Sequence, residues 1–310
     1  ARAVPAAGFP IEWISIKGLR GKGALRWVAM PFQLARALGQ TLKIVWRQKP
    51  DAMLGMGGFV SGPGALAAKL VGKPLIVHEQ NAVAGMTNRF LSRVATRVLS
   101  GFPNALPRAA HVGNPVRREF TETVRNPVDA DAALRVLVVG GSQGALALNR
   151  LVPEAMALID AGIRPAVRHQ CGRDRRDAVA ERYTDLGVDA RVDEFIDDIA
   201  EAYAEADVVI CRAGAMTVAE LAAIGVAAVF VPYPYAVSDH QSANARYLVE
   251  RDAALSLDER TLTAQKLAQV IAELAGDRAR VADMGRAAKA AARPQATADV
   301  VEVCMEVLHA

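Results

Sequence analysis

The chain of 310 residues contains few cysteines and few aromatic side chains. Its three cysteines, Cys171, Cys211 and Cys304, lie far apart in the sequence, which excludes a disulfide framework and a cysteine metal cluster and indicates a reducing compartment. Aromatic residues make up 5% and hydrophobic residues 52% of the chain, which excludes a disordered or collagen-like protein. The longest apolar stretch, Leu221–Val237, is broken by glycine and proline, so we expect no transmembrane span.

Acidic residues are scarce in the first part of the chain. Residues 1–118 contain 17 Lys and Arg but only three acids, a net charge of +14, whereas residues 119–310 carry a net charge of −10. The overall net charge of +4 hides this division. A strongly basic first part favours an anionic partner.

Residues 24–48 combine the basic charge with apolar residues at helical spacing, among them Leu25, Phe32, Leu42 and Trp46. This combination is typical of a helix that lies on an anionic membrane surface. An ordinary core-facing helix with a basic, solvated face is the alternative. Because the chain contains neither an RNA-binding aromatic signature nor a helix-turn-helix pattern, we do not expect a nucleic-acid partner.

Short apolar runs that read as strands alternate with helical segments along the chain. The expected strands are Ile11–Ile16, Ala52–Met56, Leu75–His78, Arg97–Leu99, Arg135–Val139, Pro165–Gln170, Val208–Cys211 and Ala227–Val231. The expected helices cover residues 24–48, 146–160, 173–186, 199–206 and 217–224, and a helical tail over 262–309 is interrupted near 293–294. Such alternation predicts an α/β fold of two doubly wound domains with parallel sheets, divided near residues 114–134.

The strongest local motif is Leu-Val-Val-Gly-Gly-Ser-Gln-Gly-Ala over residues 137–145, a buried strand that runs through glycines into a helix. This arrangement directs backbone N–H groups and a helix N-terminus at a phosphate, and Ser142 could add a hydroxyl donor. The spacing matches neither Gly-x-Gly-x-x-Gly nor the P-loop, which argues against a dinucleotide and against nucleotide hydrolysis. The alternative is a tight turn that binds nothing.

A second glycine cluster, residues 55–64, follows the expected strand Ala52–Met56 and could hold another phosphate on its amides. His78-Glu-Gln-Asn81 places four polar side chains at the end of the next strand, where open α/β sheets bind ligands. A structural turn and a structural histidine are the corresponding alternatives.

Two polar segments follow strands of the second half. In Arg212–Glu220, small residues open a helix, and Glu220 could accept hydrogen bonds from the paired hydroxyls of a sugar. Alternatively, Glu220 is purely structural, a carboxylate near a helix N-terminus that the helix dipole stabilises. In Asp239–Asn244, the amide of Gln241 suits sugar hydroxyls. Asp129-Ala-Asp131 has an Asp-x-Asp pattern but lies in an alanine-rich connection, so we expect no metal site.

Eight segments, taken in order, resemble the MurG family of bacterial glycosyltransferases over essentially the whole chain. They are Gly18–Gly23, Gly55–Gly64, His78–Asn81, Gly113–Arg117, Gly140–Gly144, Glu194–Asp198, Arg212–Glu220 and Asp239–Gln241. The resemblance implies a GT-B fold, that is, two Rossmann-like domains with parallel sheets facing across a cleft. It further implies an acceptor-side domain over residues 1–116, a donor domain over 117–294, and a final helix over 295–310 that returns to the first domain.

The family transfers N-acetylglucosamine from UDP-GlcNAc to lipid I, an undecaprenyl-pyrophosphoryl-MurNAc-pentapeptide, and so forms lipid II with inversion at the anomeric carbon. The resemblance implies a cytoplasmic enzyme, peripheral on the inner face of the plasma membrane, that needs no metal and no other cofactor. Two alternatives stay open: an isomerase similar to UDP-GlcNAc 2-epimerases, and a UDP-sugar-binding protein without catalysis.

The matched motifs imply individual roles for residues of this chain. The implied donor-site residues are Asn81, Arg117, Ser142 near the diphosphate, Ile196 for uracil through its backbone, Ala215, Met216, Thr217, Val218, Ala219, Glu220 on the ribose and Gln241 on the GlcNAc hydroxyls. Gly57, Gly58 and His78 are candidates for the acceptor pyrophosphate. The family often has a second amide where this chain has Ser242, so that contact is not expected.

No catalytic residue is assigned within this chain. Family members begin with a strand and a Gly-Thr-Gly-Gly-His loop, and the match to this chain starts after that loop. The loop carries the histidine proposed as the general base, which must take the proton of the attacking hydroxyl. We therefore expect that the parent protein is the transferase and that this chain of 310 residues is largely inactive on its own.

Overall fold

The computed structural model describes residues 3–15, 24–129, 132–141 and 144–309, and the chain divides into two compact units. Unit 1 comprises residues 1–80, 84–111 and 298–310, and unit 2 comprises residues 81–83 and 112–297. Each unit is an α/β structure with its own parallel sheet.

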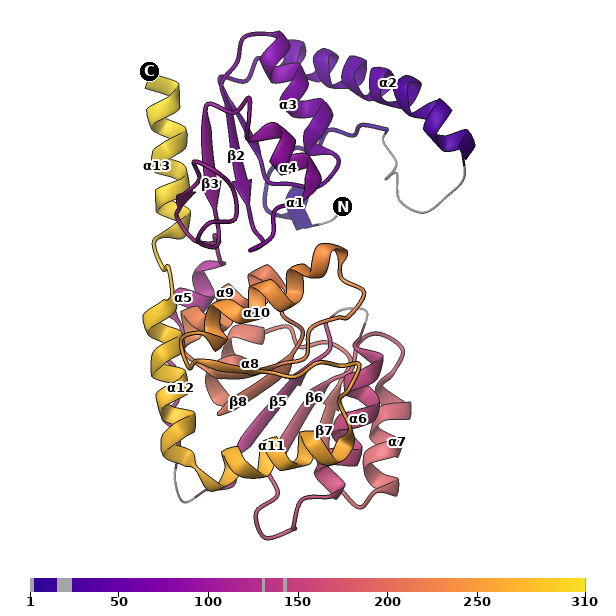
Figure 1. Ribbon diagram of the computed structural model, residues 1–310, viewed down its shortest axis with the longest axis vertical. Helices are drawn as coiled ribbons and strands as arrows, with labels where there is room; N and C mark the ends of the chain where they lie inside the picture. The colour runs from indigo at the N-terminus through magenta and orange to yellow at the C-terminus, as the bar shows by residue number, and fades with distance from the viewer. Residues whose placement is uncertain (1–2, 16–23, 130–131, 142–143, 310) are drawn as a thin grey trace. The chain divides into compact units, whose positions relative to one another are not determined.

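The described residues of unit 1 form a four-stranded parallel sheet in the order β1-β2-β3-β4 (Figure 1). The strands are β1 (Met53–Gly55), β2 (Leu75–Glu79), β3 (Arg97–Ser100) and β4 (Ala110–His111). The central strand β2 is buried along its whole length. Its apolar residues Leu75 and Val77 pack against Ala65 and Leu91 of neighbouring helices, so burial of these side chains holds the helices on the sheet.

The helices of unit 1 are α1 (Ala3–Ala6), α2 (Ala24–Gln48), α3 (Ser61–Leu70), α4 (Met86–Leu91) and, from the end of the chain, α13 (Ala296–His309). The long helix α2 packs against α3 (Figure 1). The predicted strand Ile11–Ile16 is wrong over its described residues, which are irregular. The amide of Ser15 bonds to Gln40 and the carboxylate of Glu12 pairs with Arg47, so this segment is held by side chains of α2 instead of by a neighbouring strand.

The described residues of unit 2 form a six-stranded parallel sheet in the order β10-β9-β8-β5-β6-β7. The strands are β5 (Arg135–Val139), β6 (Ala166–Gln170), β7 (Ala190–Asp193), β8 (Val208–Cys211), β9 (Ala227–Phe230) and β10 (Ala254–Ser256). The β-branched residues of β8 and β9, together with Val136 and Val138 of β5, are buried because helices cover both faces of this sheet. Chain order reverses between β5 and β8, which makes their carboxyl ends the topological switch point of the sheet.

The helices of unit 2 are α5 (Arg118–Glu122), α6 (Leu146–Ala157), α7 (Arg176–Asp185), α8 (Ile199–Glu205), α9 (Ala215–Ile224), α10 (His240–Val249), α11 (Ala264–Gly276) and α12 (Arg278–Ala291), with a 3₁₀ turn over Val237–Asp239. Right-handed crossovers in the observed strand order place α6 and α7 on one face and α8, α9 and α10 on the other. Within the described residues, no helix is both long and apolar enough to cross a membrane.

Candidate functional site

The two predicted phosphate motifs of unit 2 leave the sheet side by side. Val139 at the end of β5 is paired in register with Cys211 at the end of β8. The chain passes from Val139 into a glycine turn and from Cys211 through Arg212–Gly214 into α9. Because neighbouring strands lie only about 4.8 Å apart, both loops begin next to each other at the carboxyl edge of the sheet, where open α/β sheets bind ligands.

The glycine turn after β5 is closed so tightly that two of its positions accept only glycine. A Cβ atom at Gly140 would lie 2.9 Å from the backbone nitrogen of Ala145 and 3.0 Å from the carbonyl oxygen of Gln170. Gly144 has φ +70°, and a Cβ there would lie 2.3 Å from the carbonyl oxygen of Cys171. Ser142, which the resemblance places near the diphosphate, lies outside the described residues.

Arg175 adds a cation to this turn that the sequence motifs did not indicate. Its Cδ and Nε atoms lie 3.0 and 3.1 Å from the position of a Cβ on Gly144, so the side chain covers the turn. Arg175 is half-buried, and within the described parts of the chain no carboxylate forms an ion pair with it. Its charge therefore remains available to an anion at the turn.

The N-terminus of α9 is the second feature at this edge of the sheet whose backbone amides could bind an anion. Gly214 is the extended N-cap residue, and no described side chain caps the helix. Val218 makes the first intrahelical hydrogen bond, to Gly214, so the amides of Ala215, Met216 and Thr217 have no partner within the helix. Val218 is buried in the core and its amide already donates to Gly214, so it offers no free donor to a ligand, while Ala219 is half-buried.

Glu220 lies one turn further along α9 and is half-buried. Burial raises the pKa of its carboxyl group, and the positive charge of Arg117 lowers it again in part. Arg117 is the exposed N-cap residue of α5 and stacks on Phe120, with 4.9 Å between its guanidinium carbon and the ring centre. The two predicted donor-site residues are thus electrostatically coupled.

Asn244, a fully buried residue of α10, connects two parts of the predicted site. Its Oδ1 accepts from the amide of Ala82 at 2.8 Å, and its Nδ2 donates to Oδ1 of Asn81 at 3.2 Å and to the carbonyl of Ala213 at 3.2 Å. It therefore fixes Asn81 beside the loop that leads into α9. No local sequence pattern marks Asn244, because its partners lie far away in the chain.

Gln241 lies in the first turn of α10, after a loop with unusual backbone geometry. Ser238 and Asp239 both have positive φ values, 55° and 51°. Oε1 of Gln241 accepts from the amide of Tyr233 at 2.8 Å, so this side chain already holds the loop after β9. On the other side of that loop, Arg212 pairs with Glu259 and contacts the ring of Tyr233.

Ile196 lies in the loop that joins β7 to α8. Its side chain is buried, whereas that of Phe195 beside it is 63% exposed. Asp198 caps α8 by accepting from the amide of Glu201 at 3.0 Å, and this bond fixes the end of the loop. The buried Ile196 side chain leaves the backbone as the part of this residue that could contact a base.

The candidates for the acceptor pyrophosphate lie in unit 1. Gly57 and Gly58 have φ values of +85° and +75°, and a Cβ at Gly57 would lie 3.2 Å from Oε1 of Gln80. His78 is completely buried in β2, where its Nδ1 lies 3.1 Å from Nε2 of Gln80. The structure therefore brings the glycine turn and Gln80 together, with His78 behind Gln80.

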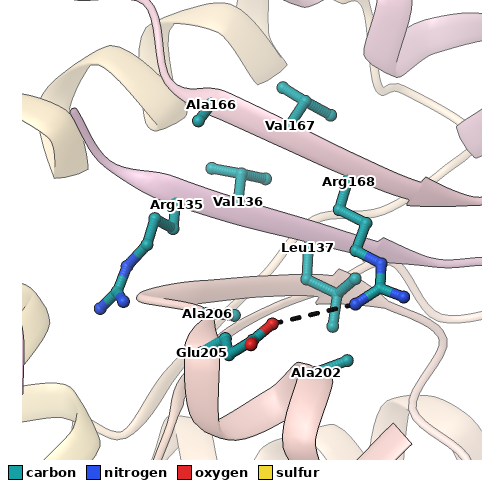
Figure 2. Close-up of a pocket in the computed structure, with 9 residues that line it drawn as sticks. All are labelled: Arg135, Val136, Leu137, Ala166, Val167, Arg168, Ala202, Glu205 and Ala206. Carbon is teal, nitrogen blue, oxygen red and sulfur yellow. Dashed lines mark ion pairs between the residues drawn. The ribbon is translucent and has the colours of Figure 1, made fainter. Parts of the chain in front are cut away.

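A separate pocket of about 190 Å³ lies at the opposite end of the unit 2 strands (Figure 2). Its lining comes from the first residues of β5 and β6 and the end of α8. Arg168 pairs there with Glu205 at 3.9 Å and with Asp193 at 2.9 Å. None of the predicted site residues lines this pocket. Among the described residues, no group of three or more His, Cys, Asp or Glu could hold a metal ion.

Comparison with known proteins assigns the chain to a family. Residues 1–100 match the glycosyltransferase family 28 N-terminal domain, and residues 135–300 match its C-terminal domain. Two relatives are named UDP-N-acetylglucosamine–N-acetylmuramyl-(pentapeptide) pyrophosphoryl-undecaprenol N-acetylglucosamine transferase. The one from Alkalilimnicola ehrlichii is 51% identical and the one from Halorhodospira halophila 52% identical, and each alignment covers 99% of this chain and 87% of the relative.

Solved structures confirm the predicted fold class of two α/β domains with parallel sheets. Acinetobacter baumannii MurG is 40% identical, with a TM-score of 0.85 over 98% of this chain and 87% of that one. A UDP-GlcNAc 2-epimerase from Neisseria meningitidis is only 11% identical, with a TM-score of 0.62 over 93% and 83% of the two chains, and shares the fold alone. By its sequence and its structure, the chain belongs to glycosyltransferase family 28 and, within it, to the MurG family of N-acetylglucosaminyltransferases.

Proposed function

We propose that the chain takes part in the transfer of N-acetylglucosamine from UDP-GlcNAc to lipid I, with unit 2 as the donor site. The activity follows from the names of the relatives and from the high identity over nearly the whole chain. The observation that supports the donor site is the convergence of the glycine turn, Arg175, the uncapped N-terminus of α9 and Glu220 at one switch point. Phosphates and ribose hydroxyls are the groups that such an arrangement binds.

In this proposal the diphosphate lies between the glycine turn and the first amides of α9, Ala215 to Thr217. Glu220 accepts from the ribose hydroxyls, and the backbone of Ile196 contacts uracil. The amide nitrogen of Gln241, whose oxygen already holds Tyr233, faces the GlcNAc hydroxyls. Asn81 and Arg117 complete the site, each held by the contacts described above.

Chemically, an acceptor hydroxyl attacks the anomeric carbon as its proton passes to a base. The bond from that carbon to the diphosphate oxygen breaks, UDP leaves, and the configuration inverts. Negative charge grows on the departing diphosphate, where the helix N-terminus and Arg175 stabilise it. We propose that these fixed positive groups carry the role for which other transferases need a metal.

On the acceptor side, we propose that the Gly57–Gly58 turn binds the pyrophosphate of lipid I through its amides, with Gln80 beside it. His78 then contributes only indirectly, by orienting the amide of Gln80, because its own side chain is fully buried.

We also propose that α2 holds the enzyme on an anionic membrane surface, at the inner face of the plasma membrane. Ala37 and Thr41 are the buried residues of its described side chains. At 100° per residue, Phe32, Arg36, Lys43 and Trp46 fall on the opposite face. Phe32 is 77% and Trp46 78% exposed, so two large apolar side chains and the cations Arg36 and Lys43 share the exposed face of α2.

Calorimetry of UDP binding to the full chain tests the donor site, with Glu220→Gln as the variant and exposed Glu181→Gln as the matched control. We expect Glu220→Gln to weaken UDP binding about tenfold, since the amide replaces a charged acceptor of ribose hydroxyls. Glu181→Gln should leave binding unchanged. Because burial raises the pKa of Glu220, UDP binding should also weaken as the pH falls into the acidic range. Equal UDP affinities for both variants would contradict the assignment.

A further inference from the structure

A chain of buried hydrogen bonds runs behind the glycine turn of unit 2. Nδ1 of His169 lies 2.9 Å from the hydroxyl of Tyr183, and Nε2 of His169 lies 3.1 Å from Oδ1 of Asn149. Nδ2 of Asn149 donates to the carbonyl of Cys171 at 2.9 Å. His169 is completely buried, and Asn149 and Tyr183 are 7% and 2% exposed. The chain thus links α7, β6 and α6 within one core.

The hydrogen-bonding capacity of these groups fixes the position of every proton. Nδ2 of Asn149 donates to Cys171, so the oxygen of the same amide faces His169 and can only accept. Nε2 of His169 must therefore carry the ring proton, and Nδ1 must accept from the Tyr183 hydroxyl. Burial lowers the pKa of His169 to about 4, which keeps the ring neutral at neutral pH. A single tautomer satisfies all three side chains.

The end of this chain bears directly on the glycine turn. The Cys171 carbonyl that accepts from Asn149 is the atom that would lie 2.3 Å from a Cβ on Gly144. The preceding carbonyl, of Gln170, accepts from the amide of Gly140 at 3.0 Å. Two consecutive carbonyls at the end of β6 therefore form the wall against which the turn is closed, and Asn149 holds one of them.

We propose that Asn149, oriented by His169 and Tyr183, is a positioning residue that sets the glycine turn for the donor diphosphate. This proposal rests on the proposed function, because it assumes that the turn faces a diphosphate. Asn149 is too deeply buried to touch the ligand, so it acts through Cys171 and Gly144. A turn that is free to shift by a fraction of an ångström would present its amides less well to a phosphate.

The test compares Asn149→Leu with Val179→Ala in the full chain. Leucine keeps roughly the same volume as asparagine but removes both side-chain hydrogen bonds of Asn149. Val179 is a buried residue of α7 in the same hydrophobic cluster as Tyr183, and its side chain forms no hydrogen bond with Asn149, His169 or Tyr183. We expect Asn149→Leu to weaken UDP binding about tenfold and Val179→Ala to leave it within about twofold. In an assay of the proposed transfer, the KM for UDP-GlcNAc should rise in Asn149→Leu while the KM for lipid I stays constant.

Tyr183→Phe gives a milder test if Asn149→Leu does not fold, since it removes only the outermost bond. In ¹⁵N-histidine spectra of the unsubstituted chain, Nε2 of His169 should show the protonated, pyrrole-type signal and Nδ1 the unprotonated, pyridine-type signal. Tyr183→Phe should shift the Nδ1 signal and weaken UDP binding.

A protonated Nδ1 would overturn the positioning role, and so would equal losses of UDP affinity in Asn149→Leu and Val179→Ala. If the unsubstituted folded chain failed to bind UDP at all, the donor site itself would be refuted. That result is distinguishable from a failure of the positioning role, which appears only in the variants.

Discussion

Two glycines of the same turn are predicted to respond differently to the same substitution. Gly141 and Gly144 have nearly equal φ values, +75° and +70°, so alanine meets the same left-handed backbone at both, at a cost of about 1–2 kcal/mol. At Gly141 the new methyl group meets nothing within 4 Å, whereas at Gly144 it would lie 2.3 Å from the Cys171 carbonyl oxygen. Relief of that overlap requires a backbone shift, which adds about 1–3 kcal/mol.

We therefore expect Gly144→Ala to destabilise unit 2 by about 2 kcal/mol more than Gly141→Ala does, which corresponds to a further decrease in melting temperature of about 4–8 °C. The chain offers separate probes for its two units. All three tryptophans lie before residue 50, in unit 1, and all five tyrosines lie in unit 2. The tyrosine signal should therefore shift in Gly144→Ala while the tryptophan transition stays in place. Equal melting shifts in the two variants would refute the argument from close packing at Gly144.

Three further predictions concern pH, charge and membranes. Burial lowers the pKa of His169 to about 4, against 6.5 in the unfolded chain, and the ring bonds to the uncharged side chains of Tyr183 and Asn149. Because the unfolded chain binds the proton more readily, the free energy of unfolding should fall by about 3 kcal/mol as the pH drops from 6.5 to 4. Denaturant titrations should show this slope flattened in His169→Gln, and an unchanged slope would count against a buried neutral ring. Arg175→Gln should weaken UDP binding about fivefold at low salt, whereas Arg173→Gln on the same loop should not, and equal effects would show a general electrostatic contribution. Lys43→Ala should weaken binding to anionic vesicles about fivefold, and equal binding of the unsubstituted chain to neutral vesicles would contradict the role of charge.

The sequence predicts the central strands of both sheets well, because burial on both faces requires continuous apolar, β-branched runs such as Arg135–Val139. Edge strands are harder to predict. In the strand Ala190–Asp193, apolar residues alternate with charged ones, and the arginine is exposed, so its sequence resembles that of a loop. At Ile11–Ile16 the error is the opposite, because a strand is predicted where the described residues form none. The polar residues Glu12 and Ser15 bond to side chains of α2 instead of pairing with a neighbouring strand.

The candidate site shows the same division between local and distant information. Glycine turns and a helix that opens with small residues are local features, and so the loops after β5 and β8 could be identified from the sequence. Arg175 and Asn244 could not, because their roles depend on contacts with residues far along the chain: Arg175 contacts Gly144, and Asn244 contacts Asn81. No local pattern distinguishes either from an ordinary polar side chain.

A crystal structure of the full chain with UDP would show directly whether unit 2 holds the donor. We expect a diphosphate within hydrogen-bond distance of the first amides of α9 and of the glycine turn, with the ribose hydroxyls on Glu220. UDP in the pocket at the opposite strand ends, between Arg135 and Arg168, or a diphosphate without contact to α9, would contradict it.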